Sequence, residues 1–158
     1  MKKLLKLLEK DAHLTDKELA LMCEKEVGDI KKMIDDYEKN GVILGYTTVI
    51  DWDKTETEYV NALIELKVIP QRGFGYDAIA EKIYNYSEVD SVYLMSGGFD
   101  LAVMLHGKTM REVAIFVASK LATLEAVTST ATHFVLRKYK DHGVIFGGME
   151  ADERGNCL

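Results

Sequence analysis

The chain has 158 residues, which is enough for one ordinary domain or two small ones. Hydrophobic residues make up 47% of it and charged residues 29%, a balance that is typical of a globular protein with an apolar core. Its net charge of −6 excludes a generic binder of polyanions, so any contact with nucleic acid must come from a local basic patch.

The cysteines and the apolar runs indicate the compartment. Cys23 and Cys157 lie far apart without metal-type spacing, which predicts a reducing environment and no disulfide framework. The N-terminal run MKKLLKLLEKD is only superficially similar to a signal peptide, because Lys6 and Glu9 interrupt its apolar stretch and no cleavage site follows. No segment approaches the roughly 18 consecutive apolar residues of a membrane span. We therefore expect a cytoplasmic protein with no membrane partner.

The first part of the chain predicts three short helices. Residues 2–10 carry leucines at helical spacing with lysines on the other face. A second helix at 16–23 begins with a capping box, and a third at 27–40 is stopped by Gly41. The apolar run at 42–47 is expected to be a strand. This order predicts a winged helix-turn-helix.

A polar segment separates this part from the rest. Residues 51–58 (DWDKTETE) show no periodicity and are interpreted as a linker, with Trp52 packing on one of the two units that it joins. The expected organisation is a helix-turn-helix domain at 1–50, the linker, a second domain at 59–142 and a C-terminal tail at 143–158.

The second domain predicts a β-α-β-β-α-β order. Its first run of β-forming residues ends at Pro70, the only proline, which cannot donate a hydrogen bond to a neighbouring strand. Helical spacing, a glycine hairpin, a second capping box and a final stretch of period two follow. The expected elements are strands at 59–69, 92–95, 101–105 and 128–139, a loop at 71–73, and helices at 76–86 and from 109, the last with a stripe of Val113, Phe116 or Val117, and Leu121. This is the ferredoxin-like order, in an α+β fold.

Such a sheet carries helices on one face only. The other face needs a cover, and a second copy of the chain is the usual one. We therefore expect the chain to form a dimer, or a larger even-numbered oligomer such as an octamer.

The stretch 92–107 (VYLMSGGFDLAVMLHG) holds the strongest local signal. Gly97 and Gly98 lie between two apolar runs, and glycine reaches positive φ without a steric cost, which is typical of a hairpin turn. Asp100 lies at the exit of this turn. A carboxylate beside two glycine backbones is a candidate small-molecule site, and it is equally a candidate turn residue that caps its own backbone.

Several short motifs, each weak alone, follow one another in a specific order. They are Glu18-Leu19-Ala20, Tyr37 to Tyr46 (YEKNGVILGY), Gly97 to Asp100, Leu124 to Val127, and Thr130 with Thr132. In this order and spacing the chain resembles, over almost its whole length, the Lrp/AsnC family of feast/famine transcriptional regulators. The resemblance implies a winged helix-turn-helix followed by a ferredoxin-like domain of the RAM/AsnC type.

The resemblance also implies an amino-acid effector bound between subunits, and no other cofactor. The effector-binding residues would be Gly97, Gly98, Phe99, Asp100, Thr130 and Thr132. Glycine amides can approach a carboxylate, while Asp100 and the threonine hydroxyls offer partners to an ammonium group. The alternative is that the threonines are ordinary strand residues and that Asp100 is a turn cap.

The third helix would read double-stranded DNA, yet it departs from the family's pattern. Members usually have a glycine in the preceding turn and several arginines, whereas here Glu24 replaces the glycine and residues 26–39 carry five acids against three bases. Each carboxylate that faces the groove repels phosphates. The candidate DNA-binding residues are Lys25, Gly28, Asp29, Lys31 and Lys32. The alternative for the lysines is a solvated helix face.

Three functions therefore compete. The leading hypothesis is a sequence-specific DNA-binding transcriptional regulator that responds to an amino acid or a related small molecule. The acidic third helix motivates a second, an effector-binding co-regulator that has lost DNA affinity and assembles with a DNA-competent relative. The third is an enzyme, because sirohaem decarboxylases share this two-unit architecture. The four histidines are scattered, however, and no nucleophile–base pair, metal spacing or phosphate loop stands out, so we expect neither catalytic nor metal-binding residues.

Overall fold

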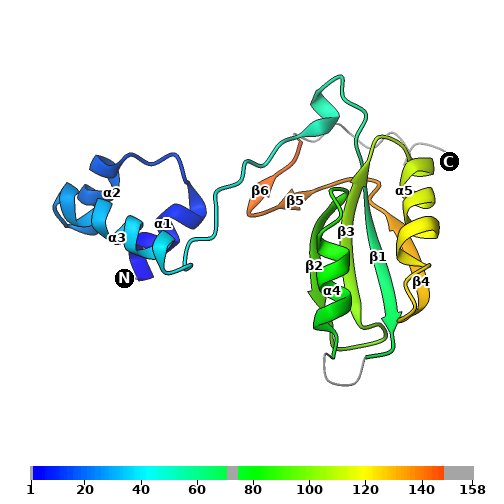
Figure 1. The fold of residues 1–158 in the computed structure, drawn as a ribbon. Helices are drawn as coiled ribbons and strands as arrows, with labels where there is room; N and C mark the ends of the chain where they lie inside the picture. Colours follow the sequence, from blue (N-terminus) through cyan, green and yellow to red (C-terminus); the bar gives the residue numbers. More distant parts are fainter. Residues whose placement is uncertain (1, 71–74, 148–158) are drawn as a thin grey trace. The chain divides into compact units, whose positions relative to one another are not determined.

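The computed structural model describes residues 2–70 and 75–147 (Figure 1). The chain divides into two compact units, of which the first comprises residues 1–50 with 140–145, and the second residues 51–139 with the segment from 146. The predicted loop at 71–73 and residues 148–158 of the predicted tail lie outside the described residues.

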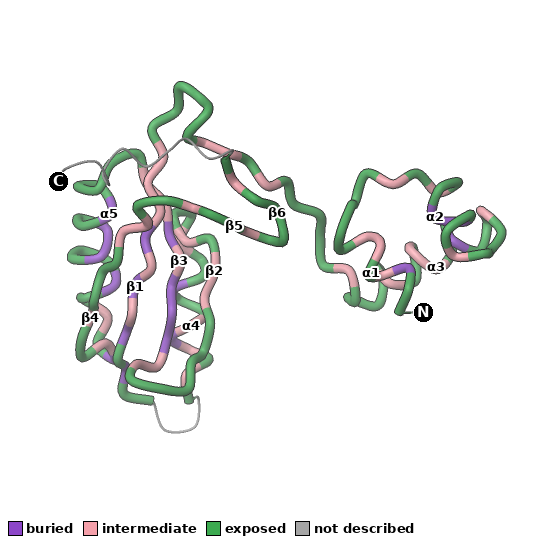
Figure 2. The backbone as a smooth tube through the Cα atoms, turned by 180° about the vertical axis from the view of Figure 1, so that it is seen from behind, coloured by how far each residue is buried: buried purple, intermediate pink, exposed green. Residues whose placement is uncertain are grey.

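The first unit is built on three helices, as predicted. They are α1 (Lys2–Lys10), α2 (Asp16–Cys23) and α3 (Val27–Lys39). Their buried side chains meet in one small core, which is made of Leu4, Leu19, Ala20 and Ile30 (Figure 2). Each helix contributes to this core, so the three helices stabilise one another through their apolar faces.

Hydrogen bonds confirm two of the predicted helix ends. At the start of α2, the Thr15 hydroxyl accepts from the Glu18 amide at 3.3 Å, and the Glu18 carboxylate accepts from the Thr15 amide at 2.8 Å. After α3, Gly41 has a φ of +67° and the Val42 amide donates to the Tyr37 carbonyl at 2.8 Å. This ending needs a residue in the left-handed conformation, which explains the glycine.

The strand predicted at 42–47 is wrong. Residues 42–50 form no strand, although several of their apolar side chains are exposed, with 55% of Val42 and 93% of Leu44 open to solvent. A strand requires a neighbour for its amides and carbonyls. No strand among the described residues of this single chain pairs with the segment, so the helix-turn-helix is present while its wing has no partner strand.

The second unit confirms the predicted β-α-β-β-α-β order. Its elements are β1 (Val60–Val68), α4 (Asp77–Tyr84), β2 (Val89–Leu94), β3 (Leu101–Gly107), α5 (Met110–Phe116) continued by a π-helical turn at Val117–Leu121, and β4 (Val127–Phe134). The sheet has the order β2-β3-β1-β4, and every neighbouring pair is antiparallel. The two most apolar strands, β1 and β3, therefore occupy its centre.

The chain after residue 127 differs from the single strand predicted at 128–139. The last strand ends at Phe134 rather than at residue 139, and a separate hairpin follows, made of β5 (Lys140–Asp141) and β6 (Val144–Ile145). His142 and Gly143 both have positive φ in its turn. Two more apolar residues, Val135 and Leu136, follow Phe134 directly, so the sequence pattern alone did not reveal the end of the strand.

The helices α4 and α5 lie on one face of the sheet. They stand in front of the strands in Figure 1 and behind them in Figure 2, where the other face is turned to the viewer. The alternate residues Ala62, Ile64, Leu66 and Val68 of β1 are buried beneath these helices. The buried stripe predicted for α5 is confirmed, since Val113, Phe116, Val117 and Leu121 all belong to the same core.

The linker residue Trp52 packs on the second unit, which is one of the two units predicted as its partner. It opens a short 3-10 helix, η1 (Trp52–Lys54), and its ring stacks on Tyr59 with centroids 5.1 Å apart. Tyr59 stacks in turn on His106 of β3 at 5.3 Å. The surrounding burial, and then the charge of Asp90, raises the pKa of the Tyr59 hydroxyl.

Candidate functional sites

The turn between α2 and α3 orients the candidate DNA-binding helix. Glu24 ends α2 in the left-handed conformation, with φ 56° and ψ 48°, which strains any residue that carries a Cβ. The Lys25 amide closes the turn by donating to the Ala20 carbonyl at 3.0 Å. Ile30 is fully buried and anchors the first turns of α3, so the opposite side of this helix faces solvent.

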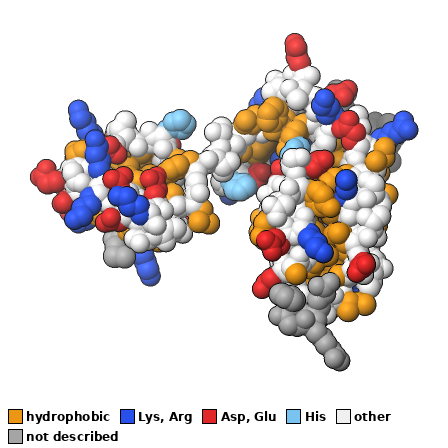
Figure 3. Space-filling view, viewed as in Figure 1, with side chains coloured by type: hydrophobic (Ala, Val, Ile, Leu, Met, Phe, Trp, Pro, Cys, Tyr) orange, Lys and Arg blue, Asp and Glu red, His pale blue; other side chains and the backbone are white. Residues whose placement is uncertain are grey.

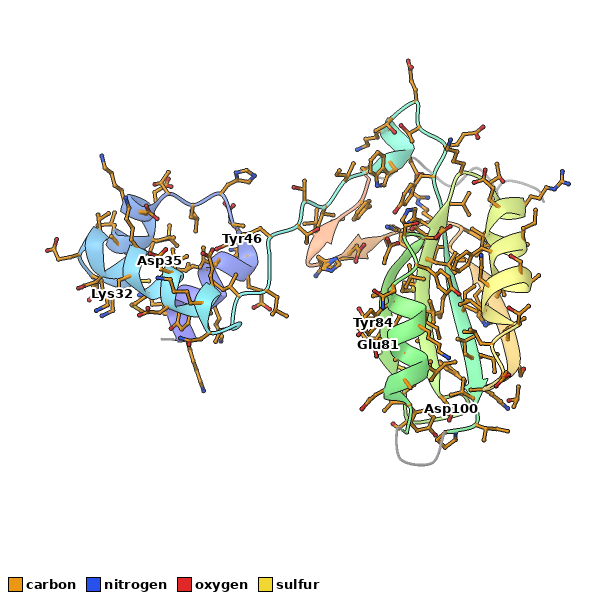
Figure 4. The ribbon with its side chains drawn as sticks, viewed as in Figure 1. Lys32, Asp35, Tyr46, Glu81, Tyr84 and Asp100 are labelled. Carbon is orange, nitrogen blue, oxygen red and sulfur yellow. The ribbon has the colours of Figure 1, made fainter. Side chains whose placement is uncertain are left out.

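All five candidate DNA-binding residues lie on this exposed surface, namely Lys25, Gly28, Asp29, Lys31 and Lys32. Lys31 already has a partner, because its Nζ lies 3.6 Å from Oδ2 of Asp16 at the start of α2. Lys32 and the nearby Asp35 both extend from α3 (Figure 4). The structure thus brings the set together, and contact with DNA stays a prediction.

Charges of both signs share the surface of the first unit. Figure 3 shows its acidic and basic side chains intermingled rather than separated. Asp35, Asp36 and Glu38 are exposed on the second half of α3. Such a surface attracts phosphates less strongly than a uniformly basic one. The acidic residues by which the third helix departs from the family's pattern are therefore exposed in the folded chain as well.

The turn between β2 and β3 is the first part of the candidate effector site. The Met95 amide donates to the Asp100 carbonyl at 2.8 Å and closes the loop. Gly97 has a φ of +156°, which residues with a side chain rarely adopt, and a Cβ added at Gly97 or Gly98 would meet nothing within 4 Å. Both backbones are exposed, so a small anion can approach their amides closely.

Asp100 connects this turn to the rest of the sheet. Its Oδ2 accepts from the Val68 amide at 2.8 Å, and its Oδ1 accepts from the Tyr76 hydroxyl at 3.4 Å. The Val68 amide lies where the pairing of β1 with β4 shifts register, between Lys67 and Val68. Asp100 therefore binds the end of β1, opposite the point where β4 carries one extra residue, rather than capping its own turn. A carboxylate has about four acceptor positions, so this half-buried one can still accept from an ammonium group.

The two threonines are not beside the turn within one chain. Thr130 pairs with Leu66 and Thr132 with Ile64, and directly opposed residues of antiparallel strands point to the same face. Since Ile64 and Leu66 are buried under the helices, both threonines point to the helix side, at the edge strand β4. They are separated from β3 by the whole width of β1, about 10 Å between alternate strands.

Three of the four histidines lie beside separate carboxylates. His106 Nδ1 lies 2.7 Å from Asp90, His133 Nε2 lies 3.3 Å from Glu65, and His142 Nδ1 lies 3.0 Å from Asp141. Within the described ranges, no three side chains of the metal-binding types converge. Each of these three histidines is thus explained by its own carboxylate neighbour.

One feature was not anticipated from the sequence, a groove of about 490 Å³ between α1 and the segment 42–46. Leu5, Leu8 and Val42 are among its lining residues. The Tyr46 hydroxyl at its rim donates to Oε1 of Glu38 at 2.9 Å, and burial followed by this bond raises the pKa of Tyr46. The apolar residues at 42–46 are the part of the sequence that could have indicated this groove, but the same residues also predict an ordinary strand.

Comparisons with known proteins agree with both units. The family model described as the Lrp/AsnC ligand binding domain matches residues 61–145. An uncharacterized HTH-type transcriptional regulator of Bacillus subtilis (strain 168), YugG, is 45% identical over 152 residues, which cover 96% of this chain and 92% of that protein. In the residues that the structure describes, no helix combines the length and the apolar character needed to cross a membrane.

Two solved structures share the fold. A transcriptional regulator from Neisseria meningitidis, solved as a complex with L-Met, has a TM-score of 0.71 at 19% identity and covers 88% of this chain and 89% of its own. The structure of AsnC from E. coli has a TM-score of 0.65 at 18% identity, with 87% of this chain and 90% of that one covered.

Proposed function

Because this chain belongs to the Lrp/AsnC family, we propose that it is a sequence-specific DNA-binding transcriptional regulator that responds to an amino acid or a related small molecule. The observation that carries the proposal is the pairing of two units in one chain. One presents an exposed helix after a helix-turn-helix turn, and the other matches the ligand-binding domain of the family over residues 61–145.

DNA would bind through α3. A helix-turn-helix places its second helix in the major groove, with the N-terminal residues of that helix on the bases. In this chain those residues are Gly28, Asp29, Lys31 and Lys32, all exposed. Lys25 in the preceding turn and Lys32 are the cations that we expect to contact phosphates or bases, because Lys31 is engaged with Asp16.

A second copy of the chain would complete the protein. The helix-free face of the sheet presents half-buried apolar side chains such as Leu63 and Met104, and in the first unit the segment 42–50 has no partner strand. A two-fold axis lets a strand pair with its own copy and lets one sheet face cover another. We therefore propose a dimer, with larger even-numbered oligomers built from it.

The effector would be an amino acid held near Asp100. The exposed amides at Gly97 and Gly98 suit its carboxylate, and the remaining acceptor positions of Asp100 suit its ammonium group. Thr130 and Thr132 lie two strands away, so they would join this site only from a second subunit. The Neisseria regulator solved with L-Met supports an amino acid as the class of ligand.

The test is retardation of a duplex that contains the protein's own upstream region, over a salt series, with and without mixed amino acids. We expect retardation that weakens steeply with salt, as counterion release requires, and that changes with an amino acid. Replacing Lys25 and Lys32 by Gln should reduce the affinity and the salt dependence, whereas Lys10→Gln and Lys54→Gln on other surfaces should not. Unchanged retardation of the first double variant would contradict the assigned surface.

The acidic α3 favours one second candidate, an effector-binding co-regulator that acts through a DNA-competent relative. Its test is co-expression of two differently tagged relatives from the same cell, followed by purification through this chain. A mixed oligomer together with no retardation by the pure protein would support this candidate. Retardation by the pure protein would contradict it. The relatives that match the chain are regulators, so we propose no catalytic role.

A further inference from the structure

The side of α3 that faces away from the core of the first unit carries residue types that helix packing does not explain. Ile30, Ile34 and Tyr37 turn towards the core of the first unit. The 3.6-residue period of the helix therefore turns Gly28, Asp29 and Lys32 away from it, and all three are exposed.

Gly28 is unusual within this helix. Glycine inside a helix is less favourable than alanine, yet a Cβ at Gly28 would meet nothing within 4 Å. Neither packing nor a positive φ demands a glycine here. A bare backbone on an exposed helix surface is suited to close approach by a ligand.

Asp29 and Lys32 follow this bare position closely on the exposed side of α3. They are three residues apart, so they are neighbours on the helix surface, about 5–6 Å between Cβ atoms. Among the described residues, neither side chain has a hydrogen-bond or ion-pair partner, whereas Lys31 binds Asp16. A carboxylate acceptor and an ammonium donor thus stand side by side at the N-terminal half of the helix.

We propose that Asp29 and Lys32 determine the DNA sequence that the protein recognises, with Asp29 accepting from N4 of a cytosine and Lys32 donating to O6 and N7 of a neighbouring guanine. This inference rests on the proposed DNA-binding function and deepens it. Cytosine is the base whose major-groove edge presents only an amino donor, and guanine the one that presents two adjacent acceptors. The rise between the two residues, about 4.5 Å along the helix, is close to one base step of about 3.4 Å.

The same assignment accounts for the single carboxylate, Asp29, in the first turn of the helix. A carboxylate weakens the attraction to DNA phosphates by the same amount on every sequence. It forms a favourable hydrogen bond only with a base that presents a donor. Asp29 therefore lowers non-specific affinity and raises the ratio of specific to non-specific binding. Gly28 allows the approach that a short aspartate side chain needs.

The experiment is selection of bound duplexes from a library with a random core, followed by affinity measurements on the selected site and its single-base variants. The variants are Asp29→Asn and Lys32→Gln. Their matched controls are Asp36→Asn and Lys39→Gln, which change the same charges on the same exposed side of α3, two turns further on. Circular dichroism of each variant checks that the helices are retained.

We expect the wild type to select a cytosine beside a guanine and to lose about 10-fold to 100-fold in affinity when either is changed. Asp29→Asn should shift the cytosine preference to adenine, because asparagine pairs with the N6 and N7 atoms of adenine. Asp36→Asn should raise the affinity for all sequences without changing the selected base.

Two results would overturn the inference, and they differ from each other. If the wild type selects a site and Asp29→Asn leaves its base preference unchanged, Asp29 merely stabilises the start of the helix, and the regulatory function stands. If the oligomeric wild type retards no duplex at low salt, the proposed DNA-binding function fails, and this inference fails with it.

Discussion

The two units of this chain differ in how much buried apolar material holds each of them. The core of the second unit contains fourteen buried residues, drawn from its sheet and both of its helices, whereas the core of the first contains four. The first unit also contains the strained Glu24 and the exposed apolar segment at 42–50. Small cores give marginal stability, so the unit that carries α3 tolerates the loss of a buried side chain less well than the second unit does.

The difference in buried apolar residues between the two units also bears on function. Regions that adapt on binding tend to come from the less stable end of a structure. The helix-turn-helix unit can therefore settle onto DNA, while the sheet holds the residues around Asp100 in fixed register. Four substitutions test this comparison, each with a control variant or a counterpart.

The largest effect should come from Ile30→Ala in the small core. Removing this fully buried side chain costs about 2–5 kcal/mol, which is close to the whole stability of a unit of this size, roughly 3–8 kcal/mol. We expect the amides of α3 to lose protection against hydrogen exchange while those of β3 keep it. Ile83→Ala, in the large core, should cost a similar amount and leave the second unit folded. Equal loss of protection in both units would contradict the comparison.

Asp100→Ala should destabilise the second unit by about 1–3 kcal/mol, because it leaves the Val68 amide without its acceptor. Asp100→Asn keeps an oxygen at that position and should cost less, while it removes the charge that would bind an ammonium group. Denaturant unfolding measures the first effect, and effector-dependent DNA retardation measures the second. If both variants were as stable as the wild type, the hydrogen bond from Val68 to Asp100 would not contribute to the stability of the second unit.

Glu24→Gly should instead stabilise the first unit, by about 0.5–1 kcal/mol, because glycine adopts the left-handed conformation without strain. Lys25→Gly is the control, since Lys25 is not among the residues with positive φ. It should be neutral or destabilising. The midpoint of thermal unfolding, followed by helical circular dichroism, distinguishes the two.

The smallest effect concerns pH and the first unit alone. Hydrogen bonds from the Thr15 side chain and backbone lower the pKa of the Glu18 carboxyl from 4.5, so its contribution to stability is complete above that pH and is lost as the pH falls through the lowered value. Glu18→Gln should reduce the loss of stability of this unit on acidification from pH 6. An unchanged acid profile would mean that the capping box does not depend on the charge. Glu112, which caps α5 by accepting from the Lys108 amide, is the counterpart in the second unit.

Local patterns predicted most of the fold. The spacing of leucines, the Thr15 capping box and Gly41 predicted three helices, and the order of the second unit followed from its strands and hairpin. The predicted strand at 42–47 was wrong for a different reason, because a strand depends on a partner strand and none pairs with it among residues 2–70 and 75–147. The predicted strand at 128–139 was too long, because apolar residues continue past Phe134, and the hairpin of β5 and β6 was not predicted.

The candidate sites were predictable only in part. Residue types identified Asp100 as the charge beside the turn, but its bond to the Val68 amide spans 32 residues and could not be read from neighbouring positions. Likewise the threonines looked like partners of the turn, and only the strand register shows that β1 lies between them and β3. Exposure of the α3 residues, by contrast, followed directly from helical periodicity.

The stacking of Trp52 on Tyr59 gives the protein an internal optical reporter. Trp52 is the only tryptophan of the chain, so all indole fluorescence originates from this one junction between the linker and the sheet. Its emission should shift to longer wavelength only when the indole leaves the Tyr59 ring and enters water. We expect melting of the three N-terminal helices alone to change this signal little, because Trp52 and Tyr59 both belong to the second unit. Detachment of the linker, during unfolding or when an effector is added, can therefore be followed in the unlabelled protein.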